Sequence, residues 1–362
     1  MISTKKGLGA LVIVTAIGLV IACSKKSGSG DTQPTVNGFD KGAMLSNYAN
    51  NLIIPAYTGL QQQIDALETG VNDFLNSPSA TTQQALLPVF KTAYLQFEKV
   101  SVDQFGPAER VLFNNFLNTF PTDNAVIDGN INRGTYDLSI NSAINQQGFP
   151  ALDYLLFSAN AVSKATATNS ANYKKYVRDV VARMKTLTAS VLNSWKTTYR
   201  AEFTGNTKSD AGSPIAFMIN QFAFEMDQMK GPRIGWPYGK QSGGTQYPQN
   251  TEGYEAGISV ALAVENLTNL KAMFNSGGSG KGMSDYLIAL NKQQLSTDVL
   301  KQFDVAINSL KAIPDPLSSA LFNNKTQVDA AYREIQILLT LIKTDVASAT
   351  GVRITYQDTD GD

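Results

Sequence analysis

The chain has 362 residues, of which 43% are hydrophobic and 17% are charged, ordinary values for a globular protein with a sizeable core. Its 30 basic and 30 acidic residues balance and form no long run of like charge, which argues against nucleic acid as a partner. The sequence has no histidine, which excludes a Ser-His-Asp triad, a histidine-ligated zinc site and the Glu-x-x-His pairs of di-iron bundles.

The N-terminal segment has the pattern of a secretory signal. Two lysines precede an apolar run over residues 8–22, and the only cysteine, Cys23, follows it directly. The run is too short for a comfortable transmembrane helix. Residues 20–23 (VIAC) resemble the bacterial lipobox, whose cysteine is acylated and becomes the mature N-terminus. We predict a lipoprotein signal peptide over 1–23 and a flexible tether over 24–37, the alternative being an ordinary signal peptide with a chance cysteine.

Helical periodicity dominates the remainder of the chain. Apolar residues recur at intervals of three and four, which predicts amphipathic helices that each bury one face. The clearest stripes, in chain order, are Leu60–Phe74, Phe90–Val100, Tyr173–Tyr199, Ile215–Met229, Val260–Phe274, Val299–Ile313 and Val328–Val346. We therefore predict an all-α fold of two antiparallel, up-and-down helical bundles packed side by side, over residues 38–204 and 205–362.

Local signals mark where several of these helices begin and end. Ser79 and the threonines after it predict a helix cap, and residues 210–214 predict another helix start. The glycines of 277–280 are expected to break the chain after the Val260–Phe274 stripe. Pro55 should kink the first helical pattern or mark its true start.

Two segments depart from the helical pattern. Residues 121–147 are polar and rich in Asn, Asp and Gly, which predicts a long excursion between helices with a short helix near 139–145. Residues 352–356 alternate apolar and polar side chains and are the best candidate for a strand.

Three stretches resemble the imelysin-like family, which includes insulin-cleaving membrane proteases and iron-regulated protein A. They are residues 51–57 (NLIIPAY), 105–107 (FGP) and 148–156 (GFPALDYLL), and together with a later helix ending near Trp195 they occur in the family's order. The resemblance implies two helical bundles with a pocket near their interface, and a cell-envelope location that is often lipid-anchored. It also implies a link to iron or to peptide hydrolysis, and only the resemblance points to either.

The family signature G-x-H-x-x-E is degenerate in this chain. Gly148 keeps the glycine, Pro150 stands in place of the histidine, and Asp153 stands in place of the glutamate. Proline offers a metal no side-chain ligand, and Asp153 alone is a weak site for a hard cation such as iron or another divalent ion. The alternative is a helix start, with Pro150 at a first helical position, Asp153 in the first turn, where the helix dipole favours its charge, and apolar neighbours in the core.

Residues 231–244 have the most unusual local composition. Arg233, Trp236, Tyr238 and Lys240 lie among glycines directly after a helical stripe. The two cations and the flat indole are suited to an anion-binding or carbohydrate-like lip. The alternative is an ordered loop whose aromatic rings cover the end of a bundle.

Several carboxylates lie near the apolar stripes. We expect most of them to be solvated or paired with lysines and arginines, a mixed site with Asp153 being the alternative. They are Glu98, Glu109, Glu225, Asp227 and Glu265.

Taken together, the sequence predicts a lipid-anchored protein of the bacterial cell envelope, at the outer membrane, on its periplasmic or surface face. We expect no catalytic residues and a binding role in iron or metal uptake, with the membrane and an envelope protein of an iron-uptake system as partners. The alternatives are a metal-dependent peptidase with an all-carboxylate site around Asp153, and a scaffold that docks another envelope protein through residues 231–244.

Overall fold

Every regular element is a helix in the part of the chain that the computed structural model describes, residues 38–278 and 280–356. The predicted all-α class is confirmed. Within those two ranges no helix has the length and apolar character needed to cross a bilayer. Cys23 and the tether over 24–37 lie outside the described residues. The division into bundles over 38–204 and 205–362 stays a prediction.

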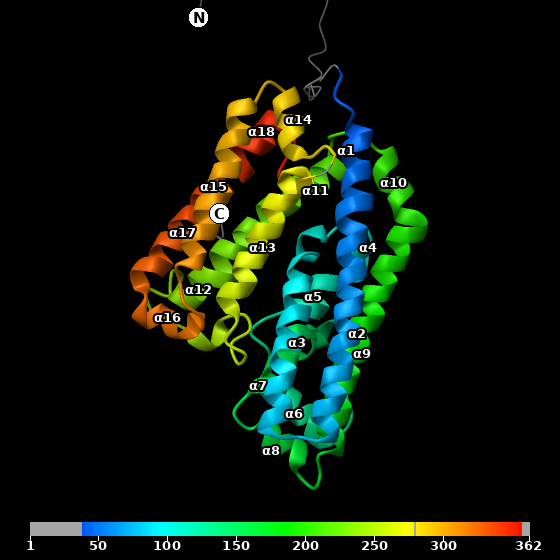
Figure 1. Cartoon of the computed structure of the whole chain (residues 1–362), viewed down its shortest axis with the longest axis vertical. Helices are drawn as coiled ribbons and strands as arrows, with labels where there is room; N and C mark the ends of the chain where they lie inside the picture. Colours follow the sequence, from blue (N-terminus) through cyan, green and yellow to red (C-terminus); the bar gives the residue numbers. More distant parts are fainter. Residues whose placement is uncertain (1–37, 279, 357–362) are drawn as a thin grey trace, which may run out of the picture. The chain divides into compact units, whose positions relative to one another are not determined.

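The first half of the described chain is built around a long antiparallel trio. Helix α2 packs against α3 and α9, and the three lie side by side in Figure 1. The apolar stripe of α2, from Leu60 to Phe74, is buried between them. The elements of this half are α1 Lys41–Asn47, η1 Tyr48–Ile53, α2 Ile54–Asn76, α3 Ala80–Glu98, η2 Ser101–Asp103, α4 Pro107–Arg110, α5 Phe113–Asn118, α6 Asn124–Arg133, η3 Asn141–Gln146, α7 Gly148–Phe157, α8 Ala161–Thr166, α9 Ala171–Ser194, η4 Trp195–Tyr199 and α10 Arg200–Gly205.

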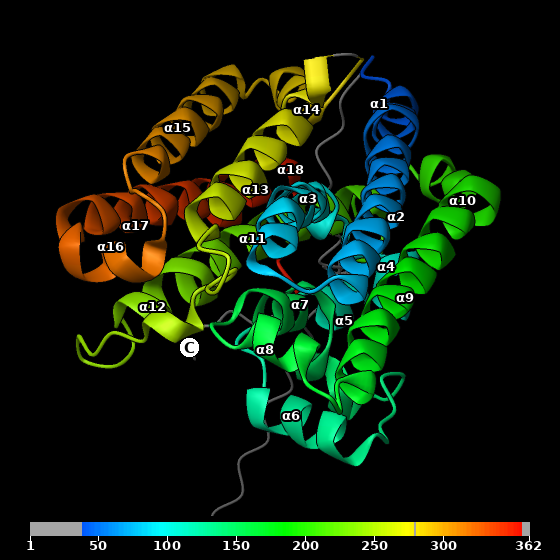
Figure 2. The same cartoon turned by 60° about the horizontal axis from the view of Figure 1, so that its bottom comes forward.

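The second half is built around α13, α15 and α17. Helix α15 contacts both of the others, and Figures 1 and 2 show the three side by side. Contacts of α3 with α13 and of η2 with α11 join the two halves of the chain. The elements of this half are α11 Pro214–Gln228, η5 Met229–Gly235, α12 Trp236–Tyr238, η6 Pro248–Asn250, α13 Ser259–Phe274, η7 Ser276–Gly278, α14 Met283–Ala289, α15 Gln293–Lys311, α16 Leu317–Asn323, α17 Lys325–Thr340, η8 Leu341–Val346 and α18 Ala347–Thr350.

Wide π-helical turns extend several of the helices, at η1, η4, η5 and η8. At η1 the backbone N–H of Ile54 donates to the carbonyl of Ala49, five residues back. Pro55 then lies in the first turn of α2, where its missing N–H costs little. Helical backbone runs without a gap from α1 through η1 into α2, so Pro55 does not mark the start of the helix, and the wide turn η1 directly before it accommodates the proline.

The predicted caps are present. Ser79 accepts the Thr82 backbone N–H at 3.1 Å, and the Thr82 hydroxyl accepts the Ser79 N–H at 3.0 Å, which is a reciprocal capping box. Ser213 accepts the N–H of Ala216 at 3.3 Å, directly before Pro214 begins α11. Helix α13 ends at Phe274, as the following glycines predict.

Two predictions about the irregular segments are wrong. Residues 124–133 form α6, because Asp123 caps the start by accepting the Val126 N–H at 3.0 Å and Gly134 ends the helix with φ of 71°. The short helix near 139–145 is confirmed as η3. Residues 352–356 form no strand. Their backbone bonds instead to the side-chain amide of Asn220, which donates to the Arg353 carbonyl and accepts the Thr355 N–H.

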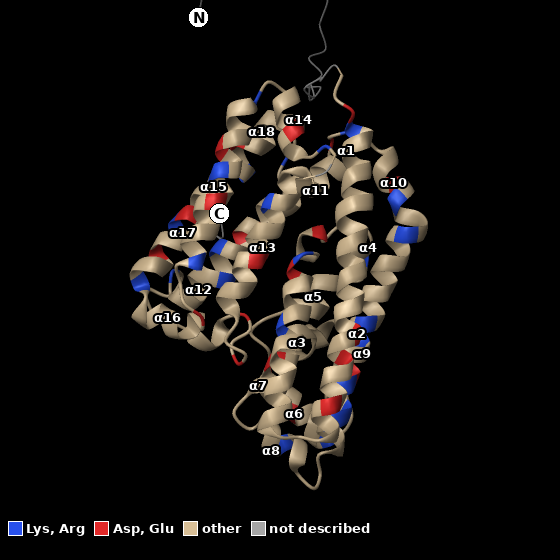
Figure 3. Cartoon of the chain, in the orientation of Figure 1, with Lys and Arg blue, Asp and Glu red and all other residues tan. Residues whose placement is uncertain are grey.

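Charged residues of both signs are distributed over the helices of both halves (Figure 3). Most of the ion pairs are at the surface, for example Lys175 with Asp179 and Lys271 with Asp304. Such exposed pairs contribute about 0–1 kcal/mol each. A small group of charges is buried where α3, η5 and α13 meet, and this group forms the centre of the candidate site.

Candidate functional site

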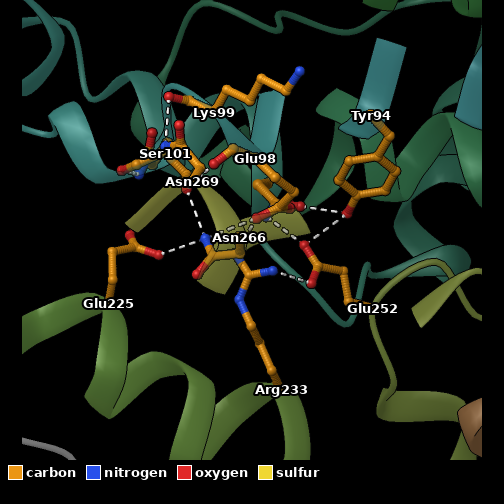
Figure 4. Close-up of polar contacts among 11 residues, drawn as sticks. Tyr94, Glu98, Lys99, Ser101, Glu225, Arg233, Glu252, Asn266 and Asn269 are labelled. Carbon is orange, nitrogen blue, oxygen red and sulfur yellow. Dashed lines mark hydrogen bonds and ion pairs between the residues drawn. The ribbon is translucent and has the colours of Figure 1, made fainter. Parts of the chain in front are cut away.

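Arg233 is buried between two carboxylates. Its Nη2 lies 3.0 Å from Oε2 of Glu98, and its Nη1 lies 2.5 Å from Oε2 of Glu252. The side chain of Arg233 is 6% exposed, and those of Glu98 and Glu252 are 0% and 2% exposed. Figure 4 shows the guanidinium extending toward both acids from below. A pair removed from water this completely is stable only when further hydrogen bonds satisfy its remaining polar atoms.

Asn266 of α13 supplies part of that hydrogen bonding. Its Nδ2 lies 3.0 Å from Glu98 Oε2 and 3.1 Å from Glu225 Oε2, so one amide joins two acids (Figure 4). Glu225 lies on α11 and is buried as well. We call Glu98, Glu225, Arg233, Glu252 and Asn266 the Arg233 cluster.

Burial governs the ionisation of this cluster. It raises the pKa of Glu98 well above its ordinary value, against the opposing effect of Arg233. It also raises the pKa of Glu225, again opposed by Arg233. Burial lowers the pKa of Arg233, but the carboxylates of Glu252 and Glu98 outweigh that effect and keep the guanidinium charged. One cation in the cluster is therefore balanced by its acidic neighbours, while Glu98 Oε1 and Asn266 Oδ1 have no hydrogen-bond partner in the described part of the chain.

Local sequence explains how Arg233 reaches this position. Residues 231–238 are helical, so the prediction of a loop beginning at 231 is wrong. Pro232 cannot donate the N–H that an α-helix requires, and the chain passes it in the π-helical turn η5. Gly235 allows this turn to pack closely on α17, because a Cβ there would lie 2.8 Å from the ring of Tyr332. The wide turn thus directs Arg233 inward.

The other residues predicted for a binding lip lie further out. Trp236 is 37% exposed. Tyr238 donates to Asp329 Oδ2 at 2.9 Å, and Lys240 Nζ lies 2.7 Å from Asp329 Oδ1. Lys240 and Arg233 therefore do not act together, since each is paired with carboxylates of its own.

The degenerate motif lies at the start of α7, next to the Arg233 cluster. Gly148 has φ of 78°, and a Cβ there would lie 2.3 Å from the carbonyl oxygen of Leu117. Only glycine fits both conditions. Phe149 stacks on Tyr94 at 4.5 Å between ring centroids, and the Tyr94 hydroxyl donates to Glu252 at 3.2 Å. Helix α7 thus packs against the Arg233 cluster through the contact of Phe149 with Tyr94.

Asp153 holds the backbone of a neighbouring segment. Its Oδ2 accepts the N–H of Glu255 and its Oδ1 accepts the N–H of Ala256, both at 2.8 Å. Burial raises the pKa of Asp153 to about 7, and the two N–H donors oppose the rise. The expectation that Asp153 lies in the first turn of a helix is wrong, because α7 begins at Gly148 and has no acidic residue in its first turn. Asp153 is instead held by hydrogen bonds to another segment.

Two polar cavities flank these residues and have the side chain of Phe120 in common. The first, of about 300 Å³, is lined by Arg233, Trp236 and Glu225 together with a set of side-chain amides, and we call it the amide cavity. Its amides are Gln104, Asn114, Asn115, Asn118 and Gln228. The second, also of about 300 Å³, is lined by Pro150 and Asp153, and we call it the motif cavity.

No group of three or more Asp, Glu, Cys or His side chains in residues 38–278 and 280–356 is arranged to hold a metal ion. Asp153 was the predicted metal ligand. Both of its oxygens accept backbone N–H groups, and the side chain of Pro150 beside it has no donor atom. The residues present therefore do not fit a carboxylate-ligated metal centre at the motif.

The five stripe carboxylates have different environments. Glu98, Glu225 and Asp227 are buried, whereas Glu109 is exposed and Glu265 pairs with Lys99 at 3.4 Å.

Sequence reasoning missed Glu252, Asn266 and Tyr94. Glu98 follows Phe97 and is four residues from Tyr94 on the buried stripe of α3. An acid on such a stripe is the signal that marks the cluster.

These observations define an all-α protein with a buried ion cluster between helices and two polar cavities beside it. Residues 53–343 match the family model described as Imelysin, and the chain belongs to the imelysin family.

Named relatives agree with this assignment. The chain is 21% identical to iron-regulated protein A of Synechococcus elongatus over 328 residues, which covers 87% of each protein. A solved structure described as an iron-regulated protein A precursor from Parabacteroides distasonis has a TM-score of 0.73 at 18% identity, covering 89% of this chain and 97% of that one. An imelysin-like protein from Psychrobacter arcticum gives a TM-score of 0.69 at 18% identity, covering 87% and 97%. At these identities the solved structures show the fold alone.

Proposed function

We propose that this chain is a lipid-anchored cell-envelope protein that binds a small ligand in the course of iron acquisition and does not hydrolyse peptides. Membership of the imelysin family and similarity to a protein named iron-regulated protein A support the link to iron and to the envelope. The residues around the motif support binding over hydrolysis.

The observation that favours binding over hydrolysis is the hydrogen bonding of Asp153. A peptidase of this family type would need a metal-bound water near the motif, and the metal would need free carboxylate or imidazole ligands. Asp153 gives both oxygens to backbone N–H groups, and Pro150 takes the place of the imidazole. The motif therefore has a structural role: Asp153 links α7 to the backbone of residues 255–256, and we call this link the structural joint. The nearby amide cavity offers the space and hydrogen-bonding groups for a ligand.

The first test separates binding from hydrolysis. We would purify the full-length lipoprotein in detergent, measure bound metals, and assay cleavage of unstructured peptides, with Asp153→Ala as the matched variant. We expect no cleavage and no metal that depends on Asp153. Stoichiometric metal that is lost in Asp153→Ala, together with peptide cleavage by the unmodified protein, would contradict the proposal.

The second test concerns the anchor. The lipobox resemblance supports acylation of Cys23, which gives stable membrane attachment because each buried methylene contributes about 0.8 kcal/mol. Cells grown with an alkyne-labelled fatty acid should incorporate the label into the protein and not into Cys23→Ser. The variant should also leave the membrane fraction. Labelling that persists in Cys23→Ser would show that Cys23 is not the acylation site.

A third test concerns the proposed role in iron acquisition. Deletion of the gene should slow growth of its host when iron is scarce and leave growth in iron-rich medium unchanged. Cross-linking in intact cells should then recover an envelope protein of an iron-uptake system as partner. Equal growth of the deletion strain under both conditions would remove the link to iron while leaving the binding role to be tested on the purified protein.

A further inference from the structure

The side chains that line the amide cavity indicate which class of ligand it would bind. Five side-chain amides line it, and each amide can both donate and accept hydrogen bonds. The aromatic rings of Phe120, Phe224 and Trp236 also line it. A concave site that combines flat apolar faces with a few polar groups is suited to a small amphipathic molecule.

Part of this hydrogen-bonding capacity is unused. Asn114 Nδ2 donates to the carbonyl of Ser101 at 2.7 Å, but its buried Oδ1 has no partner in the described part of the chain. Across residues 38–278 and 280–356, the side chains of Asn115 and Gln228 make no hydrogen bond within the protein. The Oδ1 of Asn114 is closed off from the cavity, so the amides open to a ligand are those of Asn115 and Gln228, which can bond to it without giving up a bond within the protein.

Charge in the cavity is already balanced. Arg233 lines the cavity, yet its guanidinium is paired with Glu98 and Glu252. Burial raises the pKa of Glu225, which favours its neutral form. An anionic ligand would therefore find the guanidinium already neutralised by Glu98 and Glu252, and a cationic ligand would be repelled by the guanidinium. Neither sign gains a free partner, and a neutral ligand avoids both penalties.

We propose that the amide cavity binds a neutral, hydroxyl-rich small molecule of monosaccharide size, with Trp236 against its apolar face and the amides of Asn115 and Gln228 bonded to its hydroxyls. This assignment rests on the proposed binding function and specifies the ligand of the same site. Trp236 is at the mouth, where it is 37% exposed, so a ring can stack on it without rearrangement of the core.

Saturation-transfer NMR on the full-length lipoprotein in detergent tests the proposal. The neutral probes are D-glucose, N-acetyl-D-glucosamine and myo-inositol, and their charged counterparts are D-gluconate and D-glucosamine. We expect at least one neutral probe to bind, with an affinity that changes little between about 50 mM and 500 mM NaCl because no net charge is screened. The charged counterpart of that probe should bind about tenfold more weakly.

Three variants locate the binding. Trp236→Ala should weaken it about tenfold, and Gln228→Ala should weaken it by a smaller factor. Tyr247→Ala is the matched control, because Tyr247 is 39% exposed and does not line the cavity. It should bind as the unmodified protein does. Equal melting temperatures among the variants would establish that each is folded.

Each contrary outcome overturns the assignment. Failure of every neutral probe to bind at about 10 mM, stronger binding of gluconate or glucosamine, or binding that Trp236→Ala leaves unchanged would each do so. Ferric citrate serves as a separate probe of the wider function. If it binds in a manner that depends on Trp236 while the neutral probes do not, the ligand class is wrong and the iron-related binding function survives.

Discussion

The two neighbouring cavities show two different ways in which a folded chain accommodates buried carboxylates. In the motif cavity, Asp153 accepts two backbone N–H groups from the segment that passes it. Beside the amide cavity, Glu98 and Glu252 are paired with the guanidinium of Arg233. The first arrangement joins backbone to side chain, and the second joins side chains from α3, η5 and the segment before α13.

The difference shows where function is to be sought. Raised pKa values occur in both places, for Asp153 and for Glu98 and Glu225. Perturbed ionisation therefore does not by itself separate a binding site from a structural joint. Hydrogen-bonding groups that line a cavity and have no partner do separate them, because Asp153 has both oxygens occupied, whereas the amides of Asn115 and Gln228 line the amide cavity and make no hydrogen bond in the described part of the chain.

The largest effect is expected from removal of the central cation. Arg233→Leu leaves Glu98 and Glu252 buried without a partner, and loss of one member of a buried pair costs about 3–5 kcal/mol. Urea denaturation should show this loss in the free energy of unfolding. Arg333→Leu is the control, since Arg333 is 68% exposed and its pair with Glu334 should contribute less than about 1 kcal/mol. Equal losses in the two variants would contradict the structural role of the cluster.

The second effect tests the joint at the motif. Asp153→Ala removes the acceptor of two backbone N–H groups, which should lower the free energy of unfolding by about 2–3 kcal/mol at pH 5. Asp315 makes an equivalent pair of bonds to the N–H groups of Val260 and Ala261, at 2.8 and 3.0 Å. Asp315→Ala should therefore cost a similar amount. An Asp153→Ala protein as stable as the parent would argue that the aspartate is kept for another purpose.

The pH dependence of stability gives a third, smaller effect. Asp153 is raised to a pKa of about 7 when folded, from 3.8, so between these values the folded chain holds a proton that the unfolded chain has released. Stability from this group is therefore complete below pH 4 and is lost as the pH rises through 7. From pH 5 to pH 7 the loss should be about 2 kcal/mol. Glu98 and Glu225 change stability in the same direction, and they remain present in Asp153→Asn. The fall in stability should be smaller in that variant, and equal falls would assign the pH dependence to the Arg233 cluster alone.

Much of the fold was predictable because it depends on local periodicity. The stripes on α2, α9 and α17 are regular, and the caps Ser79 and Ser213 mark the starts of α3 and α11. Helix α6 was missed because its sequence is polar and rich in Asn and Gly. Only Ile127 and Asn130 are buried on it, so it has no stripe to detect, and its capping residues were the remaining signal.

The candidate site was predictable only in part. Gly148, Pro150 and Asp153 came from resemblance, and Arg233 and Trp236 came from an unusual local composition. Glu252 and Asn266 had no such signal, because their partners lie on other elements that only the fold brings to them, Arg233 and Tyr94 for Glu252 and Glu98 for Asn266. The sequence also did not predict that the Arg233 side chain is directed into the protein. That direction depends on the π-helical turn η5, which places Arg233 inside the protein.

The smallest effect is expected at Lys240, which the composition of residues 231–244 placed in one lip with Arg233. The ammonium of Lys240 lies 2.7 Å from Asp329 Oδ1, with 36% and 52% of the two side chains exposed. Such a pair contributes less than about 1 kcal/mol, so Lys240→Gln should barely change the midpoint of urea denaturation. Lys240 holds the pKa of Asp329 below its ordinary value, and the small contribution should therefore disappear as the pH falls below 4. Since Lys240 does not line the amide cavity, Lys240→Gln should also leave probe binding intact. A large loss of binding would mean that residues 231–244 act as a single charged lip after all, and the contrast between an interior Arg233 and an exterior Lys240 would fail.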